Sequence, residues 1–272
     1  MPTTKIAIVQ MKSSENKQDN LKVSIKFIDE ASAKGASLVF FPEFQMAFSP
    51  ARQSARQLSE IAEALEGGFV SSICRAAKRY RIGVIATIYE KSTIPARVFD
   101  TAIAVNPVGR ISAVYRKLHL YDALGFKESD KLAAGDAIAT PTRTKAGNVG
   151  LMICYDIRFP EMSRLLTVQG ATILAAPSAW VHGVMKEEHW QTMLKARAIE
   201  NGLYVVAPDQ VGNIYSGRSM VVDPFGIVLL DMGNREGMEV IEIDKTRIDK
   251  VRESLPLLKN RRTDIYQISD SS

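Results

Sequence analysis

Cysteine and histidine, the residues that most often build disulfides and zinc sites, are scarce in this sequence of 272 residues, which contains two cysteines and three histidines. Two cysteines cannot form a disulfide framework, and three histidines without a close pair predict no zinc site. The sequence has no apolar run of about 18 residues, so no membrane span is predicted. The N-terminus leads directly into an expected strand at residues 6–9, which argues against a signal peptide. We therefore expect a cytoplasmic protein with reduced thiols.

The charge of the chain is modest and does not favour a polyanionic partner. The formal net charge is +5, and the basic residues are scattered apart from Lys259, Arg261 and Arg262 near the C-terminus. No zinc-ligand spacing, helix-turn-helix signature or aromatic RNA-binding motif accompanies them, so nucleic-acid binding is not expected. The sequence also lacks a phosphate-binding glycine-rich motif and a Gly-x-Ser-x-Gly elbow.

Short apolar segments alternate with helical patterns through the first two-thirds of the chain, which predicts a layered α/β fold with a mixed sheet. Strands are expected at 6–9, 38–41, 83–89, 149–153, 171–176, 203–207 and 239–243. Helices are expected at 20–34, 56–65, 69–80, 160–168, 187–200 and 244–251. Turn-forming residues at 106–109 and 223–226 predict two hairpins. So many strands form either one very wide sheet or two sheets packed face to face, with helices outside.

Cys154 lies in the most informative stretch, residues 149–161. An apolar run ends at the cysteine, a polar turn follows, and Pro160 begins an expected helix, where a missing N–H costs nothing. The run 149–153 is too short for a helix and predicts a strand buried on both faces. Ligands of α/β proteins bind at the carboxyl ends of such strands. A lone cysteine is also a common core residue, which is our interpretation of Cys74, so Cys154 needs partners before it indicates catalysis.

Two further apolar segments end at ionisable residues. Glu43 follows the bulky segment 38–41 and Pro42, where a carboxylate is costly unless it is solvated, paired or functional. Lys117 directly follows the second strand of the first hairpin, expected at 110–115. Each residue also has an ordinary structural interpretation. Glu43 would then be a helix-cap or salt-bridge glutamate, and Lys117 a solvated loop lysine.

Glu43, Lys117 and Cys154 together suit acyl transfer. A thiol is only partly ionised at neutral pH and needs a base or a nearby cation, which Glu43 and Lys117 would supply. Glu43 would take the thiol proton and return it to a leaving amine. Lys117 and the backbone N–H of Tyr155 would stabilise the oxyanion of the tetrahedral intermediate.

A cysteine–histidine mechanism is the competing interpretation. Only His119, His182 and His189 are available. His119 is two residues from Lys117, and alternation along an extended segment would put both side chains on one side. Each histidine taken alone is interpreted as a structural or surface residue.

Three segments in this order resemble the signature segments of the nitrilase superfamily of carbon–nitrogen hydrolases. They are Phe-Pro-Glu at 41–43, Tyr-Arg-Lys-Leu-His-Leu at 115–120 and Cys-Tyr-Asp-Ile-Arg-Phe-Pro-Glu at 154–161. Segments at 177–179, 196–201 and 219–224 are also similar to family segments. The resemblance extends over about residues 5–244, nearly the whole chain.

The resemblance implies a four-layer α-β-β-α sandwich with mixed sheets that usually dimerises through helices beside the site. It implies that Glu43 is the base, Lys117 the oxyanion stabiliser and Cys154 the nucleophile. Many members use a second glutamate to position the substrate or leaving group, and Glu128 matches that position. No metal or organic cofactor is implied, and a homodimer or higher homo-oligomer is expected without nucleic-acid or membrane partners.

The residues after Cys154 are similar to the amidase branch that contains ω-amidases and deaminated-glutathione amidases. The leading hypothesis is therefore an amidase that cleaves the terminal amide of a small aliphatic or carboxylate-bearing substrate through a thioester and releases ammonia. Arg158 would anchor a substrate carboxylate or, alternatively, form an ion pair with Glu161 or Asp156. Phe48, Tyr121 and Trp180 are candidates for the pocket wall.

Two alternatives to an amidase stay open at this point. An N-carbamoyl hydrolase or nitrilase would use the same three residues, and a non-catalytic dimeric binding protein would use only the fold. Residues 1–254 are expected to form one hydrolase domain, and residues 255–272 a C-terminal tail that docks on a neighbouring subunit.

Overall fold

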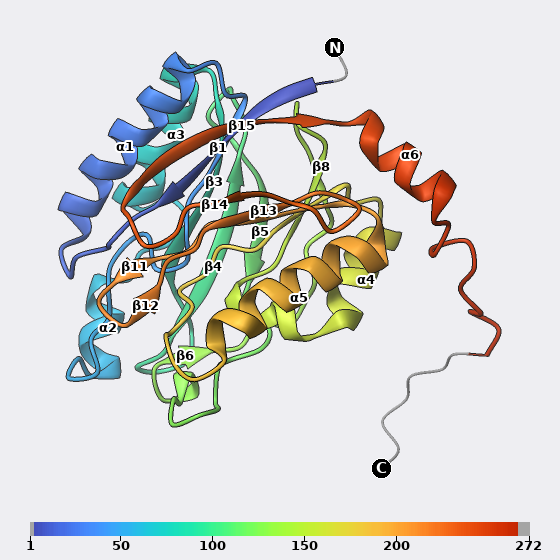
Figure 1. The fold of residues 1–272 in the computed structure, drawn as a ribbon. Helices are drawn as coiled ribbons and strands as arrows, with labels where there is room; N and C mark the ends of the chain where they lie inside the picture. Colours follow the sequence, from blue (N-terminus) through green and yellow to red (C-terminus); the bar gives the residue numbers. More distant parts are fainter. Residues whose placement is uncertain (1–2, 266–272) are drawn as a thin grey trace.

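The computed structural model describes residues 3–265 and has two mixed β-sheets at its centre (Figure 1). The first sheet has the strand order β15-β1-β2-β3-β4-β5, and β6 pairs with β4. Its strands are β1 Thr3–Gln10, β2 Leu38–Phe40, β3 Gly83–Lys91, β4 Val98–Val105, β5 Ile111–Arg116, β6 Leu132–Ala133 and β15 Gly237–Asp244. The parallel pairs β1·β2 and β2·β3 bring the carboxyl ends of β2 and β3 to one edge.

The second sheet has the order β14-β13-β10-β9-β8-β7. Its strands are β7 Thr142–Arg143, β8 Asn148–Leu151, β9 Ile173–Ala175, β10 Tyr204–Ala207, β13 Met220–Val222 and β14 Val228–Asp231. A separate short ribbon consists of β11 Val211–Gly212 and β12 Tyr215–Ser216. β8, β9 and β10 are parallel, so the end of β8, which leads to Cys154, lies beside the ends of its neighbours.

Helices cover the outer face of each sheet. The α-helices are α1 Lys17–Ala33, α2 Ala55–Ile61, α3 Gly68–Tyr80, α4 Pro160–Val168, α5 Lys186–Asn201 and α6 Thr246–Ser254. In Figure 1, α1 and α3 lie on one side of the sheets, and α4 and α5 lie on the other. None of the helices within residues 3–265 is long and apolar enough to cross a membrane.

Alternation along β1 explains the layers. Ala7 and Val9 belong to the hydrophobic cluster that contains α1 and α3, whereas Ile6 and Ile8 belong to the cluster that contains the second sheet. Because neighbouring side chains of a strand point to opposite faces, the first sheet contacts helices with one face and the second sheet with the other. The predicted α-β-β-α sandwich is confirmed, and of the two arrangements left open by the strand count, two packed sheets is the correct one.

The predicted elements are present with shifted ends. α4 has the predicted bounds, whereas α2 ends at Ile61, before the expected limit at residue 65. The segment 121–135 contains the 3₁₀ helix η1 (Glu128–Asp130) and β6. A second 3₁₀ helix, η2 (Cys154–Arg158), follows β8.

The C-terminal tail begins after α6. Residues 255–265 contain turns but no helix or strand, and residues 266–272 lie outside the described part of the chain. Arg252 of α6 donates to the carbonyl of Gly202 at 3.0 Å, which fastens the end of α6 to the end of α5. The docking of residues 255–272 on a second subunit stays a prediction.

Candidate active site

Glu43 is fixed in the turn that follows β2. The carbonyl of Pro42 accepts a hydrogen bond from Thr87 Oγ1 at 2.8 Å, and the carbonyl of Glu43 accepts one from Gln210 Nε2 at 2.9 Å. Phe44 adopts a left-handed conformation with φ of 55°. The side chain of Glu43 is fully buried. The turn is therefore tied to β3 of the first sheet and to the segment that follows β10 of the second sheet, and these contacts set the position of the carboxylate.

Lys117 directly follows β5 and is held by its backbone on both sides. Its N–H donates to the carbonyl of Asp100 on β4 at 2.9 Å, and its carbonyl accepts from the N–H of Gly135 at 2.8 Å. A Cβ atom at Gly135 would lie 2.4 Å from the carbonyl oxygen of Arg116, so only glycine permits this close approach. The Lys117 side chain is fully buried.

Cys154 is the first residue of η2 and lies at the carboxyl end of β8, as predicted. Its N–H donates to the carbonyl of Pro177 at 2.9 Å. Its φ of 45° is left-handed, which is uncommon for a residue other than glycine and often marks a functional site. The backbone N–H of Ala179 lowers the pKa of the thiol, against the larger effect of burial, which raises it. Tyr155, whose N–H was predicted as an oxyanion donor, is the next residue of η2.

Asp156 connects the turn around Cys154 to the segment around Lys117. One carboxylate oxygen accepts from the Tyr115 hydroxyl at 2.7 Å and from the N–H of Ile153 at 2.8 Å. The other accepts from the N–H of His119 at 3.2 Å and lies 2.7 Å from His119 Nδ1. Tyr115 and His119 flank Lys117 by two residues on each side. Asp156 therefore fixes the lysine segment against the cysteine turn.

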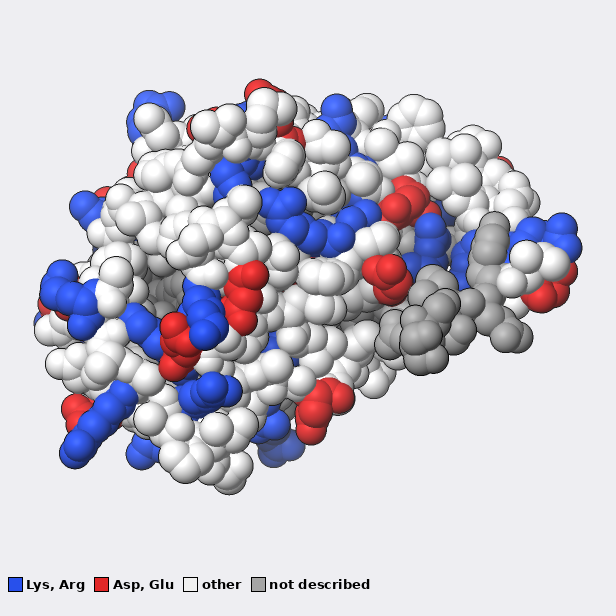
Figure 2. Space-filling view, turned by 90° about the horizontal axis from the view of Figure 1, so that it is seen from below, with Lys and Arg blue, Asp and Glu red and all other residues white. Residues whose placement is uncertain are grey.

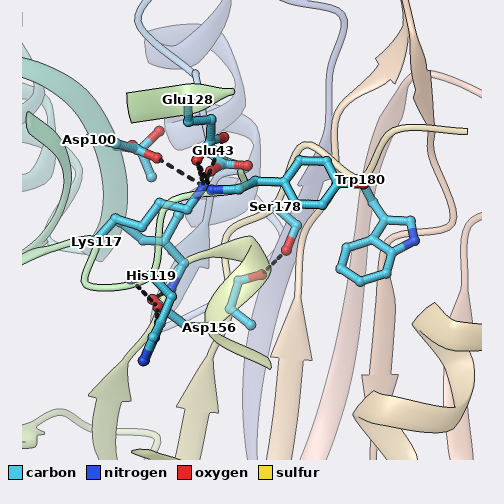
Figure 3. Close-up of polar contacts among 12 residues, drawn as sticks. Glu43, Asp100, Lys117, His119, Glu128, Asp156, Ser178 and Trp180 are labelled. Atoms are coloured by element: carbon cyan, nitrogen blue, oxygen red, sulfur yellow. Dashed lines mark hydrogen bonds and ion pairs between the residues drawn. The ribbon is translucent and has the colours of Figure 1, made fainter. Parts of the chain in front are cut away.

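The ammonium group of Lys117 lies among three carboxyl groups, as Figure 3 shows. Its Nζ is 2.7 Å from Glu43 Oε1, 2.8 and 3.0 Å from the two oxygens of Glu128, and 3.9 Å from Asp100 Oδ2. Glu128 is held in turn by the N–H of Tyr121 at 2.8 Å. Three of the predicted site residues, Glu43, Lys117 and Glu128, are thus in direct contact although 85 residues separate the first from the last.

The burial of this cluster controls its ionisation. Burial raises the pKa of the Cys154 thiol well above its ordinary value, the Glu43 carboxylate raises it further, and Lys117 opposes both. Burial works against the charged form of Lys117, but the carboxylates of Glu128 and Glu43 outweigh it and hold the lysine pKa well above its usual range. Burial also raises the pKa of Glu128, against the influence of Lys117. These shifts favour a thiol at Cys154 and an ammonium group at Lys117 in the resting site.

The histidines do not accompany the thiol. His119 pairs with Asp156 and stacks on Phe159 with ring centroids 3.6 Å apart, and His182 and His189 are exposed. The expectation that His119 and Lys117 share a side was wrong. The chain leaves the sheet after β5, so strand alternation does not continue, and Lys117 points to Glu43 while His119 points to Asp156.

A cavity of about 410 Å³ opens next to Cys154 and Glu128. Aromatic rings dominate its wall, and they come from Phe44, Tyr89, Tyr121, Phe126, Tyr155, Trp180 and Tyr215. Tyr121 and Trp180 were predicted for this wall, whereas Phe48 lies outside it and packs edge-on against Tyr215. Figure 2 shows the molecule from below, where basic and acidic side chains both border a recess in the surface.

Two cations lie close to this cavity. Lys186 lines it and is only 5% exposed, with Nζ 3.1 Å from the Tyr121 hydroxyl and 4.4 Å from the ring centroid of Trp180. The Arg158 guanidinium lies 4.7 Å from the centroid of the same ring. Within residues 3–265 neither Lys186 nor Arg158 forms an ion pair, so the predicted alternative for Arg158, a pair with Glu161 or Asp156, is absent there.

Sequence reasoning missed Asp100 and Lys186. Asp100 lies inside β4, which begins at Val98. Lys186 is the first residue of α5, where the expected helix began at residue 187. A charged residue at the margin of an apolar segment is a weak signal, because most such residues are solvated.

The fold is shared with solved structures of the nitrilase superfamily. The family model described as carbon–nitrogen hydrolase matches residues 5–253. The deaminated glutathione amidase of Escherichia coli O157:H7 is 38% identical over 245 residues, which cover 90% of this chain and 92% of the relative. The chain therefore belongs to the carbon–nitrogen hydrolase family, and the predicted family and hydrolase class are confirmed.

Two solved structures are close to this fold. The Saccharomyces cerevisiae Nit3 protein, described as a member of branch 10 of the nitrilase superfamily, has a TM-score of 0.86 and 31% identity, with 96% of this chain and 97% of that chain covered. An amidase variant from Nesterenkonia sp. AN1 has a TM-score of 0.79 and 25% identity, with 96% and 94% covered. That structure shows the acetamide moiety of fluoroacetamide added covalently at the active-site cysteine.

Proposed function

We propose that this protein is a cysteine-dependent amidase that hydrolyses the terminal amide of a small carboxylate-bearing substrate and releases ammonia. The observation that carries the proposal is the contact of the Lys117 ammonium with Glu43 and Glu128 beside the cavity that Cys154 lines. A buried thiol with a raised pKa needs a base in order to attack. With His119 bound to Asp156, Glu43 is the base that the site offers.

Acylation would begin with transfer of the Cys154 proton to Glu43 while the sulfur attacks the amide carbonyl carbon. The resulting oxyanion would accept hydrogen bonds from Lys117 and from the N–H of Tyr155. An ammonium group has three N–H donors. Glu43 Oε1 and both oxygens of Glu128 lie within hydrogen-bond distance of Lys117 Nζ. The oxyanion would therefore take over the N–H that faces the more distant Glu128 oxygen, at 3.0 Å.

Collapse of the tetrahedral intermediate would break the carbon–nitrogen bond, and protonated Glu43 would give its proton to the departing nitrogen. Ammonia leaves and a thioester on Cys154 remains. Water then attacks the thioester as Glu43 accepts its proton, and expulsion of the Cys154 sulfur, reprotonated by Glu43, releases a carboxylic acid. The covalent adduct at the active-site cysteine of the Nesterenkonia amidase supports the nucleophile, and Glu128 would position the substrate and Lys117.

The cations near the cavity support a substrate that carries a carboxylate. Lys186 and Arg158 lie against the aromatic wall without a carboxylate partner in the described residues. A buried cation is costly unless it is paired, and a substrate carboxylate would pair it. The relatives named deaminated glutathione amidase support the same substrate class.

The test is ammonia release from a panel of ω-amides of dicarboxylic and keto acids, deaminated glutathione, uncharged aliphatic amides, N-carbamoyl amines and nitriles. We expect release from carboxylate-bearing amides, abolished in Cys154→Ala and unchanged in the matched variant Cys74→Ala. Intact mass spectrometry of Glu43→Gln with substrate should show an acyl group on Cys154 if deacylation is slowed more than acylation.

Ammonia release from nitriles or carbamoyl compounds alone would show that the same residues serve a nitrilase or an N-carbamoyl hydrolase and not an amidase. Activity that survives Cys154→Ala would overturn the nucleophile. Cys154→Ala should fold normally, since the exchange of a thiol for hydrogen at this turn leaves only a small cavity. No turnover of any compound, together with equal iodoacetamide labelling of Cys154 and Cys74, would favour the non-catalytic binding protein.

A further inference from the structure

Asp100 is a third carboxyl group at Lys117 that the mechanism does not use. It lies on β4, opposite Tyr89 of β3, and its side chain is 1% exposed. Its Oδ2 is 3.9 Å from Lys117 Nζ, and neither carboxyl oxygen has a hydrogen-bond partner in the structure. Figure 3 shows Asp100 and Glu43 directed at the same ammonium group.

The charges of the cluster do not balance if every carboxyl group is ionised. One ammonium group, Lys117, would face three carboxylates, which leaves two uncompensated negative charges in a buried site. The cost of an unpaired buried charge is several kcal/mol, which buried groups avoid by taking up a proton. The resting cluster therefore contains at least one bound proton besides those of the lysine.

The hydrogen bonds show where this proton resides. Glu128 accepts from Lys117 with both oxygens and from the Tyr121 N–H, and its side chain is 18% exposed, so its charge is stabilised. Glu43 accepts from Lys117 with Oε1, but its Oε2 has no donor. Asp100 accepts nothing. Of the three groups, Asp100 therefore has the least stabilised charged form and is the most favourable site for the proton.

Asp100 Oδ2 and Glu43 Oε1 lie 3.9 and 2.7 Å from the same Lys117 nitrogen, and Glu43 Oε2 and both Asp100 oxygens have no partner, so a hydrogen bond between the two carboxyl groups would satisfy both side chains. Such a bond needs a proton, because two carboxylates have only acceptors. We propose that Asp100 is a neutral carboxylic acid in the resting enzyme and donates its proton to Glu43 Oε2. Asp100 is then a positioning residue that holds the catalytic base, an inference that rests on the role proposed above for Glu43.

In this arrangement Glu43 Oε2 and one oxygen of Asp100 gain a hydrogen-bond partner. Of the buried atoms of the cluster that lacked one, only the other oxygen of Asp100 stays without. The arrangement also holds Glu43 by both oxygens, with Lys117 on one and Asp100 on the other. Hydrogen bonds to a carboxylate favour its ionised form, so the base stays ready to accept the thiol proton. Burial and the Glu43 charge both raise the pKa of Asp100, in agreement with a neutral acid.

The groups that face Asp100 are Glu43, Lys117, Glu128 and, across the strand pair, Tyr89. Glu90 and Arg116 belong to the opposite side of the sheet, because they pair next to Phe99 and Thr101. The inference thus concerns one closed set of groups.

The experiment is infrared difference spectroscopy of the substrate-free enzyme combined with pH profiles of Asp100→Asn and Asp100→Leu. Wild type should show the carbonyl stretch of a buried carboxylic acid at neutral pH, and D100N should lack it. Asp29→Asn, which alters an exposed aspartate, is the matched control and should retain the band.

Asn can donate to Glu43 and adds no charge, so D100N should keep the wild-type acidic limb of kcat/KM and most of the activity. Leu offers no donor, so D100L should shift that limb to higher pH and lower kcat/KM by about 100-fold through misplacement of the base. If D100L does not fold, the infrared spectrum and the pH profile of D100N are sufficient to test the proposal.

A carboxylic-acid band that is as strong in D100N as in wild type would overturn the proposal, whereas a weaker remaining band would belong to another buried carboxyl group such as Asp209. An acidic limb that moves to lower pH in D100N would also overturn the proposal, because it would mean that a buried negative charge had been removed. The spectrum is recorded without substrate, so it tests Asp100 even if the amidase assignment fails, whereas loss of the assignment would appear in Cys154→Ala.

Discussion

Arg116 and Lys117 are consecutive residues that form two very different ion clusters. Arg116 binds the carboxylate of Glu90 through two nitrogens, at 2.8 and 2.6 Å, and Thr101 adds a third hydrogen bond at 2.8 Å. One cation meets one carboxylate, the geometry is bidentate, and the arginine side chain is 38% exposed. Lys117 is fully buried and meets three carboxyl groups, with several oxygens unsatisfied.

The difference separates a structural ion pair from a reactive site. A balanced, fully hydrogen-bonded pair stabilises the charged form of both partners and leaves nothing to react. An excess of buried carboxyl groups around one ammonium leaves proton positions that respond to substrate. Strand alternation places the two clusters on opposite sides of β4, so the last residue of β5 and the residue that follows it contribute to different clusters.

The largest expected effect is the loss of catalysis when the Lys117 cluster is broken. Lys117→Met removes the proposed oxyanion donor and should lower kcat by at least about 100- to 1,000-fold. The matched variant Arg116→Met breaks the neighbouring pair and should keep kcat within a few-fold, at a cost of about 1 kcal/mol in stability. Steady-state kinetics and urea denaturation of both variants measure this contrast, and equal loss of kcat in the two would contradict it.

A smaller effect is expected at Lys186. Lys186→Met should raise KM for carboxylate-bearing amides by about 10- to 100-fold, the value of a hydrogen bond to a charged group. Uncharged amides of similar size should be affected little. Burial lowers the pKa of Lys186, so its cation is lost at lower pH than that of an exposed lysine, and wild-type KM for carboxylate substrates should rise on the alkaline side. Equal KM changes for charged and uncharged amides would rule out the anchoring role.

The smallest effect concerns stability and pH. Because burial raises the folded-state pKa of Asp100 above its ordinary value of 3.8, its contribution to stability is fully present below that pH and is lost as the pH rises towards the folded-state value. Asp100→Asn does not titrate. Its stability relative to wild type should therefore increase with pH above about 4, by at most about 1.4 kcal/mol per pH unit. Urea denaturation between pH 4 and 8 measures the slope, and a flat difference would contradict it.

The sequence predicted those parts of the fold that depend on local pattern. Pro160 and the apolar spacing after it set both ends of α4, and the parallel strands leading to Glu43 and Cys154 were recognisable as short buried runs. The prediction that Glu43, Lys117, Cys154 and Glu128 form the site came from the sequence motifs and their order. In the structure Glu43, Lys117 and Glu128 meet, while the roles of all four residues stay proposals.

What could not be predicted depends on the direction of side chains and on distant contacts. Asp100 becomes a site neighbour only because β4 begins at Val98 and pairs with the segment of Lys117. The backbone carbonyl of Lys186, the first residue of α5, accepts a hydrogen bond from Trp180 Nε1 at 2.7 Å, and this contact holds Lys186 at the cavity. The predicted hairpin located β5. It did not show that the chain leaves the sheet after β5, which directs the side chains of Lys117 and His119 to different partners.

The left-handed backbone at Cys154 has a consequence for how the proposed nucleophile is maintained. For an L-residue this conformation costs about 1–2 kcal/mol, and glycine would occupy it with little penalty. Fold stability alone would therefore favour replacement of this cysteine by glycine. The residue at position 154 thus represents stability given up for reactivity, and an inactive chain with glycine there should outlast the active enzyme on heating.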